Sequence, residues 1–245
     1  VYRTRNLLDS TGNPVNLSYG EQYYFLKELQ DNVCVGFEDI VPDSNLGDLM
    51  DELDFGQWPA GAKYIAAFKN MSFVAGQNSN ELRYSAAGYP EVFPPDNVFR
   101  VGDASSGDFT GFYSTKNALV VFKRYGIYLV KGDPNSGFHA ETLTEDTGCS
   151  APNSLREAPG LGVVFLADRE VWLLEGALEN TGTPTGVRRI SDPIPDHMDR
   201  LNRSALLNAC GEVYTRDREY WLAVPTLGTT SNNRVLVYHY DIGEW

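Results

Sequence analysis

Two stretches of the chain repeat one pattern of hydrophobic and polar positions. In residues 163–176, apolar runs lie on either side of Asp168-Arg169-Glu170, and residues 213–225 repeat this around Asp217-Arg218-Glu219. β-Branched and aromatic runs that flank a short polar turn are typical of a β-hairpin. The copies lie 49 positions apart (168 to 217), and a repeat of about 20 to 50 residues indicates a repeating architecture.

Two earlier hairpins join the series when the chain is aligned on an aromatic residue of each second strand. These aromatics are Tyr84, Tyr128, Trp172 and Trp221, at intervals of 44, 44 and 49 residues. The pattern predicts first strands, turns and a further strand for each unit. The first strands are Met71–Ala75, Ala118–Phe122, Gly162–Phe165 and Glu212–Thr215, the turns are 77–80, 123–126, 167–170 and 216–219, and the further strands are Val98–Val101, Ala140–Thr144, Val187–Ile190 and Val235–Tyr240.

Units of this length with three or four strands each are typical of β-propeller blades. We therefore predict an all-β chain with about four propeller repeat units in a domain spanning 58–245, because radial stacking buries both faces of each blade. A β-sandwich with evenly spaced strands is the competing architecture, but the matched Asp-Arg-Glu-x-Trp pair favours the propeller. Propellers usually have about four to eight blades, so we expect the domain to continue beyond Trp245. The approximate blades are 63–102, 107–149, 151–194 and 198–245.

Residues 1–57 differ from the repeats and are predicted to form a small β segment with one short helix. Strands are expected at 1–5, 23–29 and 33–39. Asp43-Ser44-Asn45 then precedes apolar residues at helical spacing, which predicts an amphipathic helix behind a capping residue. Its stripe is expected to pack on the strands and consists of Leu46, Leu49, Met50 and Leu53.

Composition supports an all-β globular protein. Of 245 residues, 42% are hydrophobic and 12% aromatic, with 23 Gly and 13 Pro, which favours many short strands joined by turns. No apolar run approaches the roughly 18 residues of a membrane span, so no membrane insertion is expected. The chain starts at Val1 without a leader and stops at Trp245 after a strand-like run. We expect it to be part of a longer polypeptide.

Charge and cysteine content argue against two classes of function, specific nucleic-acid binding and zinc binding. The net charge is -13 with no Lys/Arg cluster, which argues against specific nucleic-acid binding. An acidic surface favours solubility, and it would also repel DNA phosphates, so that DNA could pass without binding. Cys34, Cys149 and Cys210 lie far apart without zinc-ligand spacing. Free thiols fit synthesis in a reducing compartment.

No catalytic, cofactor-binding or metal-ligating residues are predicted, and no cofactor. His139, His197 and His239 belong to none of the common hydrolase or zincin signatures. Gly160-x-Gly162 precedes a strand rather than a helix, which argues against phosphate binding. The two Asp-Arg-Glu tripeptides are interpreted as turns. The loop 191–199 could hold a cation through oxygen ligands, but an inter-blade turn is favoured; its candidate ligands are Asp192, Asp196, His197 and Asp199.

The succession of motifs resembles the tail nozzle family of short-tailed bacteriophages, also called tail tubular protein B, and related propeller-containing phage structural proteins. The resemblance covers most of the chain in order. It is carried by Val1–Thr4, Tyr24–Glu28, Phe37–Asp39 leading into Asn45–Leu49, Phe73–Gly76, Leu82–Ser85 with Pro90 and Phe93-Pro94, Leu119–Asp133, Gly148-Cys149-x-Ala151-Pro152-x-Ser154, Gly162–Gly176, Tyr220–Pro225 and Val237–Trp245.

The resemblance implies a non-enzymatic virion component whose segment 1–57 is fibronectin-like. Similar proteins form a ring, commonly a hexamer, below the tail adaptor or connector. The ring lines the conduit for genome ejection and offers surfaces to tail fibres. DNA would pass it without sequence-specific binding, and the protein would be made in the host cytoplasm. The alternative is a carbohydrate-binding or glycan-cleaving propeller of a receptor-binding tail protein, although sialidase-type Asp-box repeats are missing from the sequence. A cellular scaffolding propeller is a third reading, but its Gly-His and Trp-Asp signature is missing too.

Overall fold

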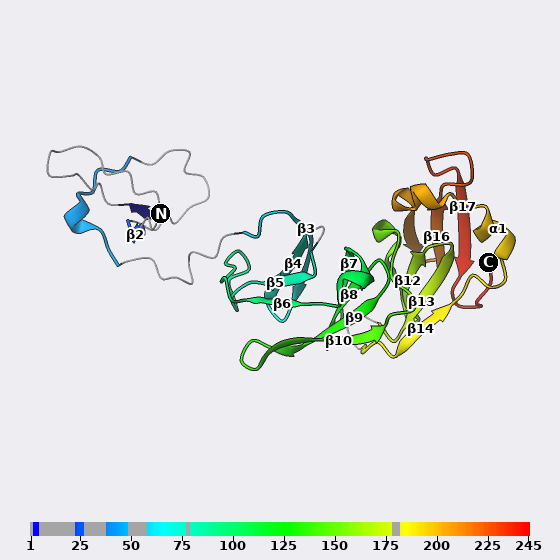
Figure 1. Cartoon of the computed structure of the whole chain (residues 1–245), viewed down its shortest axis with the longest axis horizontal. Helices are drawn as coiled ribbons and strands as arrows, with labels where there is room; N and C mark the ends of the chain where they lie inside the picture. The colour runs from blue at the N-terminus through cyan, green and yellow to red at the C-terminus, as the bar shows by residue number, and fades with distance from the viewer. Residues whose placement is uncertain (1, 5–22, 27–37, 49–57, 77–78, 178–181) are drawn as a thin grey trace. The chain divides into compact units, whose positions relative to one another are not determined.

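The computed structural model describes residues 2–4, 23–26, 38–48, 58–76, 79–177 and 182–245. The chain divides into two compact units, Val1–Gln57 and Trp58–Trp245. Figure 1 shows that strands dominate the described part of the larger unit. The all-β prediction is therefore confirmed at the level of fold class.

In the smaller unit, β1 (Tyr2–Thr4) pairs antiparallel with β2 (Tyr23–Phe25). These strands fall within the first two predicted for this segment. Of the third predicted strand, residues 33–37 lie outside the described residues, and Glu38 and Asp39 are not in a strand.

The predicted amphipathic helix is wrong where the structure describes it. A 3₁₀ helix, η1 (Asp43–Asn45), occupies the supposed capping residues and ends at Leu46, whose backbone is extended (φ -66°, ψ 145°). The Ser44 hydroxyl donates to Asn45 Oδ1 at 3.2 Å within the turn, so these side chains serve the turn rather than a following helix. Gly47 comes next and disfavours helix. Leu49, Met50 and Leu53 lie outside the described residues.

The described residues of Trp58–Trp245 form four antiparallel sheets in which the strands follow chain order. The first two sheets have four strands each. The first sheet comprises β3 (Ala62–Phe68), β4 (Met71–Gly76), β5 (Glu81–Tyr84) and β6 (Val98–Arg100). The second comprises β7 (Phe109–Ser114), β8 (Leu119–Lys123), β9 (Ile127–Asp133) and β10 (Gly137–Thr144).

The third sheet again has four strands, and the fourth sheet has three among the described residues. The third comprises β11 (Arg156–Ala158), β12 (Gly162–Ala167), β13 (Glu170–Glu175) and β14 (Gly186–Arg189). The fourth comprises β15 (Cys210–Tyr214), β16 (Glu219–Val224) and β17 (Arg234–His239). The short helices are η3 (Ala104–Ser106), η4 (Pro152–Ser154), α1 (Pro195–Asp199) and η5 (Arg203–Asn208).

The four predicted hairpins are confirmed: β4 pairs with β5, β8 with β9, β12 with β13 and β15 with β16, all antiparallel. The further strand predicted after each hairpin is also found, as β6, β10, β14 and β17. The leading strands β3, β7 and β11 and the short helices of Trp58–Trp245 were not predicted. Each unit of the first three sheets is therefore a four-stranded meander rather than a hairpin plus one strand.

The four aligned aromatics do not occupy equivalent positions. Tyr128 packs against the first sheet and Trp172 against the second, so each faces the preceding sheet. Tyr84, in contrast, packs toward the following sheet, and Trp221 is 46% exposed while its neighbour Tyr220 is buried against the third sheet. The alignment on Tyr84 and Trp221 is therefore wrong, because the hairpin turns differ in length and a one-residue shift turns a side chain to the other face.

The matched Asp-Arg-Glu tripeptides also differ in conformation. In the first copy Asp168 has a positive φ of 51°, whereas in the second copy the positive φ of 56° belongs to Arg218. The first turn is 168–169 and the second is 215–218, between the strand bounds given above. The same tripeptide therefore occurs in two turns of different length and conformation.

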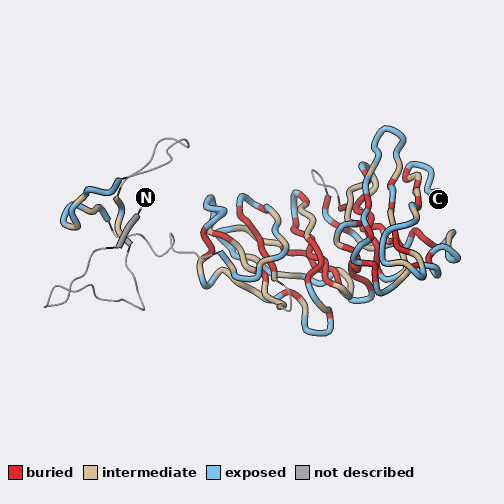
Figure 2. The backbone as a smooth tube through the Cα atoms, turned by 90° about the horizontal axis from the view of Figure 1, so that it is seen from above, coloured by how far each residue is buried: buried red, intermediate tan, exposed pale blue. Residues whose placement is uncertain are grey.

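Consecutive sheets pack face to face through three hydrophobic clusters. In β8, Leu119 and Val121 pack in the cluster shared with the first sheet, while Val120 and Phe122 pack in the cluster shared with the third. β12 repeats this, since Phe165 packs toward the second sheet and Leu166 toward the fourth. Side chains alternate across a strand, so the two middle sheets are buried on both faces, and Figure 2 shows the buried segments running through them.

The leading strands of consecutive sheets meet along one edge of the stack. β3 contacts β7, and β11 contacts β15. The Ser114 hydroxyl of β7 donates to the Ala67 carbonyl of β3 at 2.6 Å. Across the next two junctions, the Tyr113 hydroxyl donates to the Glu157 carboxylate, and Arg156 Nε donates to Glu212 Oε2 at 3.2 Å. Polar contacts therefore link all four sheets along this leading-strand edge.

Candidate functional site

A charged hollow of about 510 Å³ lies where the β12–β13 turn meets the segment after β14. It joins two features singled out in the sequence, the first Asp-Arg-Glu turn and the acidic loop 191–199. Its walls come from the turn, from α1 and from the first residue of η5. The lining residues are Asp168, Arg169, Glu170, Arg189, Ser191, Asp192, Pro195, Met198, Asp199 and Arg203.

Backbone and side-chain hydrogen bonds hold the acidic loop against the third sheet. The buried Ser191 hydroxyl accepts from the Val171 amide at 3.1 Å, and the Ile190 amide donates to the Val171 carbonyl at 2.9 Å. Met198 of α1 is buried in the cluster between the third and fourth sheets. The shape of the hollow is therefore set by core packing.

The carboxylates of the hollow are largely paired with its arginines. Arg189 Nη1 donates to Glu170 Oε1 at 2.6 Å, and Arg189 Nε contacts the Asp192 carboxylate. This hydrogen bond to Glu170 is the main cause that raises the pKa of Arg189. Arg169 Nη1 donates to the Asp199 carbonyl at 3.2 Å, while its Nε is buried without a partner among the described residues. Positive and negative side chains therefore pair with one another inside the hollow, which does not carry charge of a single sign.

The candidate cation ligands do not converge. Asp192 and Asp199 line the hollow, but Asp196 does not, and His197 lines a different groove. His197 Nδ1 accepts from Arg234 Nη1 at 3.0 Å. Within the described ranges, no group of three or more His, Cys, Asp or Glu side chains could hold a metal ion.

A second, smaller hollow of about 100 Å³ lies at the corresponding junction of the second and third sheets. The β8–β9 turn contributes Arg124 and Tyr125, and the β12–β13 turn contributes Asp168 and Glu170. Asp168 and Glu170 line both hollows, so the β12–β13 turn borders a polar hollow on either side. This repetition indicates an origin in sheet stacking rather than a specialised site.

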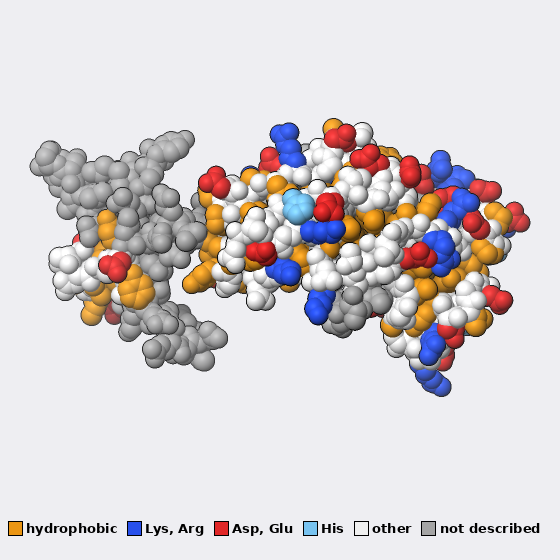
Figure 3. All heavy atoms as spheres, turned by 90° about the horizontal axis from the view of Figure 1, so that it is seen from below, with side chains coloured by type: hydrophobic (Ala, Val, Ile, Leu, Met, Phe, Trp, Pro, Cys, Tyr) orange, Lys and Arg blue, Asp and Glu red, His pale blue; other side chains and the backbone are white. Residues whose placement is uncertain are grey.

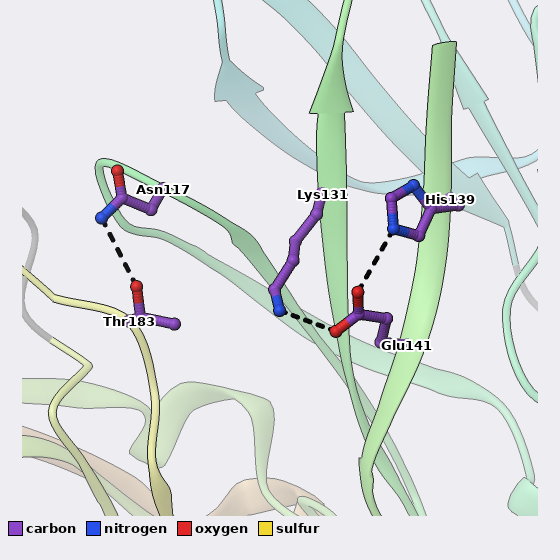
Figure 4. Close-up of polar contacts among 5 residues, drawn as sticks. All are labelled: Asn117, Lys131, His139, Glu141 and Thr183. Carbon is purple, nitrogen blue, oxygen red and sulfur yellow. Dashed lines mark hydrogen bonds and ion pairs between the residues drawn. The ribbon is translucent and has the colours of Figure 1, made fainter. Parts of the chain in front are cut away.

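The two histidines outside α1, His139 and His239, each lie beside a glutamate. Figure 4 shows Lys131 of β9 and His139 of β10 both directed at Glu141. Lys131 Nζ lies 2.6 Å from Glu141 Oε2, and His139 Nε2 lies 3.3 Å from Glu141 Oε1. The bond from Lys131 is the first cause of the lowered pKa of Glu141. His139 is 63% exposed, so this cluster is a cross-strand surface pair of the kind that contributes little stability.

Polar contacts also join the second and third sheets away from the leading-strand edge. In Figure 4, Asn117 of the β7–β8 turn reaches Thr183, and Nδ2 donates to Thr183 Oγ1 at 3.4 Å. In the fourth sheet, His239 Nε2 lies 3.4 Å from Glu219 Oε1. The face drawn in Figure 3 mixes acidic, basic and apolar side chains rather than collecting one charge.

Three buried polar groups lie at the junctions between sheets. Lys123 is fully buried, and its Nζ donates to Asn80 Oδ1 at 2.6 Å and to the carbonyls of Val101 and Asp103 at 3.2 Å each. Burial lowers the pKa of Lys123. Burial likewise raises the pKa of Cys149 to about 12 and raises that of Tyr220. These shifts follow from structural burial.

A scan against protein-family models found no match, and a search of curated proteins found no relative of the chain. Within the described residues, none of the helices has the length and apolar character needed to span a membrane.

Proposed function

We propose that Trp58–Trp245 forms four blades of a β-propeller in a structural, non-enzymatic subunit of a bacteriophage tail of the nozzle type. The observation that carries this proposal is the stacking of four consecutive antiparallel sheets. The middle two are buried on both faces through simple alternation of side chains. Radially stacked blades require this burial pattern.

The stacking favours a propeller over a sandwich. A β-sandwich has two sheets that share one core, whereas here successive sheets meet in three separate clusters. The leading strands β3, β7, β11 and β15 also meet along one edge. In a propeller the corresponding strands surround the central axis, so this edge is the proposed axial side.

The function as a tail nozzle is proposed from the resemblance of the sequence motifs to that family. The subunit would assemble into a ring, a hexamer in similar proteins, between the tail adaptor and the exit of the genome. Tail fibres would attach to its outside, and DNA would pass its inner surface. A net charge of -13 suits a wall that repels phosphate. Its place would be the virion tail, after synthesis in the host cytoplasm.

The lining of the charged hollow gives little support to the alternative function of glycan binding. Aromatic platforms and an acidic funnel would favour sugar binding, but the described lining consists of Arg, Asp and Glu with Ser, Pro and Met. Three of its four carboxylates, those of Glu170, Asp192 and Asp199, are engaged by Arg189 and Arg169. The structural role is therefore the one we propose.

Electron microscopy of phage tails tests the proposal. An antibody against Trp58–Trp245, applied to virions, should decorate the tail between the portal and the fibres. A protein that stays monomeric and is never found on a tail would contradict the structural role.

A further inference from the structure

The second sheet ends in an unusually long edge strand, β10. The first three sheets each end in a fourth strand, which pairs with no further strand among the described residues. β6 has three residues and β14 has four, whereas β10 has eight. β10 lies inside the chain, between β9 and η4, and Figure 1 shows the β9–β10 hairpin at the lower margin of the stacked sheets. This long edge is therefore a property of the fold.

The backbone groups of three residues in β10 point away from β9. The Lys123 amide donates to the Gly126 carbonyl at 2.9 Å across the β8–β9 turn. Because bonding direction alternates along an antiparallel strand, Val130, four positions after Gly126, also bonds toward β8. Ala140 lies opposite Val130, so the two residues form a pair that is not hydrogen-bonded, and Ala140 directs its N–H and C=O outward. The same alternation applies to Phe138 and Thr142.

This row of outward backbone groups is open. Within the ranges that the structure describes, Phe138, Ala140 and Thr142 form no backbone hydrogen bond on the outer side. Edges are usually protected by Lys, Pro or a bulge. β10 reads GFHAETLT, without Lys or Pro, and its irregularity lies near its end, between Thr142 and Thr144. Residues 138–142 therefore offer a regular template for another strand.

The side chains of this stretch alternate between an anchored face and a charged face. Phe138 and Ala140 pack against the cluster of the first two sheets, and the ring of Phe138 lies edge-on to Phe73 at 5.1 Å between centroids. His139 and Glu141 share the other face, where they are 63% and 47% exposed, as Figure 4 shows. Packing thus fixes the strand while the charged face stays accessible.

Residues 138–142 are complementary to themselves in an antiparallel register centred on Ala140. Outward-bonding residues of two copies must lie opposite one another, so Ala140 meets Ala140 and Phe138 meets Thr142. His139 of each copy then lies opposite Glu141 of the other. A shift by two residues keeps the hydrogen bonds but sets two histidines or two glutamates directly opposite, and like charges in that position are destabilising. Charge therefore selects the register centred on Ala140.

We propose that β10 pairs antiparallel with β10 of a second copy of this chain, about a two-fold axis at Ala140. The two four-stranded sheets then form one continuous sheet of eight strands. A two-fold contact uses the same surface on both subunits, whereas a ring closes through head-to-tail contacts between different surfaces. This contact therefore goes beyond the proposed ring and rests on the geometry of β10 alone.

Disulfide cross-linking tests both the contact and its register. His139→Cys and Glu141→Cys are prepared separately in a background carrying Cys34→Ser and Cys210→Ser, then mixed and oxidised with copper(II)–phenanthroline in air. Directly opposite Cα atoms lie about 4.5 to 5.5 Å apart, within the range that a disulfide spans. Isotopic labelling of one variant identifies mixed dimers by mass. The mixture should yield at least about fivefold more linked dimer than either variant alone, because the single variants need a like-charge register.

Charge variants test the pairing without cysteines, by sedimentation velocity over a range of concentrations. His139→Glu sets glutamates opposite one another in both halves of the contact, so self-association should weaken at least about tenfold. The double variant His139→Glu/Glu141→Lys restores opposite charges and should recover it. His139→Gln is the matched control and should change the dissociation constant less than about threefold. All three changes lie on the exposed face, so folding should be preserved.

Three results would overturn the proposal. The first is no mixed disulfide at about 0.5 mM protein, far above a micromolar dissociation constant. The second is equal cross-linking of the mixture and the single variants, which indicates random collision. The third is self-association that His139→Glu leaves unchanged. None of these results affects rings seen by electron microscopy, and missing rings would leave this contact intact, so the two proposals fail separately.

Discussion

The buried hydroxyl of Tyr220 donates a 2.8 Å hydrogen bond to the backbone carbonyl of Ser154. This bond joins β16 of the fourth sheet to η4, which precedes the third sheet. The Ser154 hydroxyl in turn donates to the Ala151 carbonyl at 2.6 Å and accepts from the Leu166 amide at 2.9 Å. A polar junction thus fixes the two sheets in an otherwise apolar cluster.

Tyr220→Phe should lower the free energy of unfolding by about 1 to 2 kcal/mol, because it leaves the Ser154 carbonyl unpaired in the core. Urea denaturation measures the change. Tyr214→Phe is the matched control, since Tyr214 lies on the neighbouring strand and is 46% exposed. Equal effects of the two substitutions would contradict the assigned junction.

Burial on both faces of the third sheet predicts an unusual mutational pattern. Phe165 and Leu166 are adjacent, face opposite clusters and are fully buried, so Phe165→Ala and Leu166→Ala should each cost about 3 kcal/mol in unfolding free energy. Of the adjacent pair Trp221 and Leu222 in β16, only Leu222 is buried, so Leu222→Ala should cost about as much, whereas Trp221→Ala should cost under about 1 kcal/mol. Chemical denaturation distinguishes the pairs; a tolerant Phe165 or Leu166 would contradict the stacking.

The sequence allowed the hairpins to be predicted but not the faces of their strands. Runs such as Leu119–Lys123 and Glu170–Glu175 are rich in β-branched, aromatic and large apolar residues. β3 was missed because Ala66 and Ala67 are weak strand formers, and β11 because it has three residues, two of them charged. The length of the hairpin turn determines which of Tyr220 and Trp221 faces the core. The interval between repeats does not give the turn length, so the buried residue could not be predicted from it.

The charged hollow could not be predicted from sequence. Glu170 and Arg189 are 19 positions apart and meet only because β13 pairs with β14. The acidic loop 191–199 was interpreted as a turn, whereas its residues 195–199 form α1. Its candidate ligands separate in space, since Asp192 and Asp199 line the charged hollow and His197 lines a different groove beside β17. Strand pairing and the short helix α1 determine this division.

Lys123→Met should destabilise the fold by about 2 kcal/mol at pH 7, because Asn80 and two carbonyls lose a buried donor. The pKa of Lys123 is lowered from 10.5 by burial. Between the folded pKa and 10.5 the unfolded chain binds more protons, so wild-type stability should rise with pH in that window. Urea titrations at several alkaline pH values should show a smaller rise in the variant; an unchanged slope would contradict the assignment.

The two described cysteines should differ sharply in reactivity. Cys149 is buried and its pKa is raised to about 12, whereas Cys210 is exposed. Because the thiolate is the reactive form, a folded Cys34→Ser variant should release one equivalent of thionitrobenzoate from Ellman's reagent at pH 8, and a second only after denaturation. Adding Cys210→Ser should abolish the fast phase. A fast phase that survives would place Cys149 at the surface.

The most direct test of the proposed structural role is single-particle electron microscopy of the purified full-length protein. We predict closed rings of several copies around a central channel, with a propeller in each subunit whose blades include the four stacked sheets. Monomers at all concentrations, or sheets that pair into a two-layered sandwich, would contradict it.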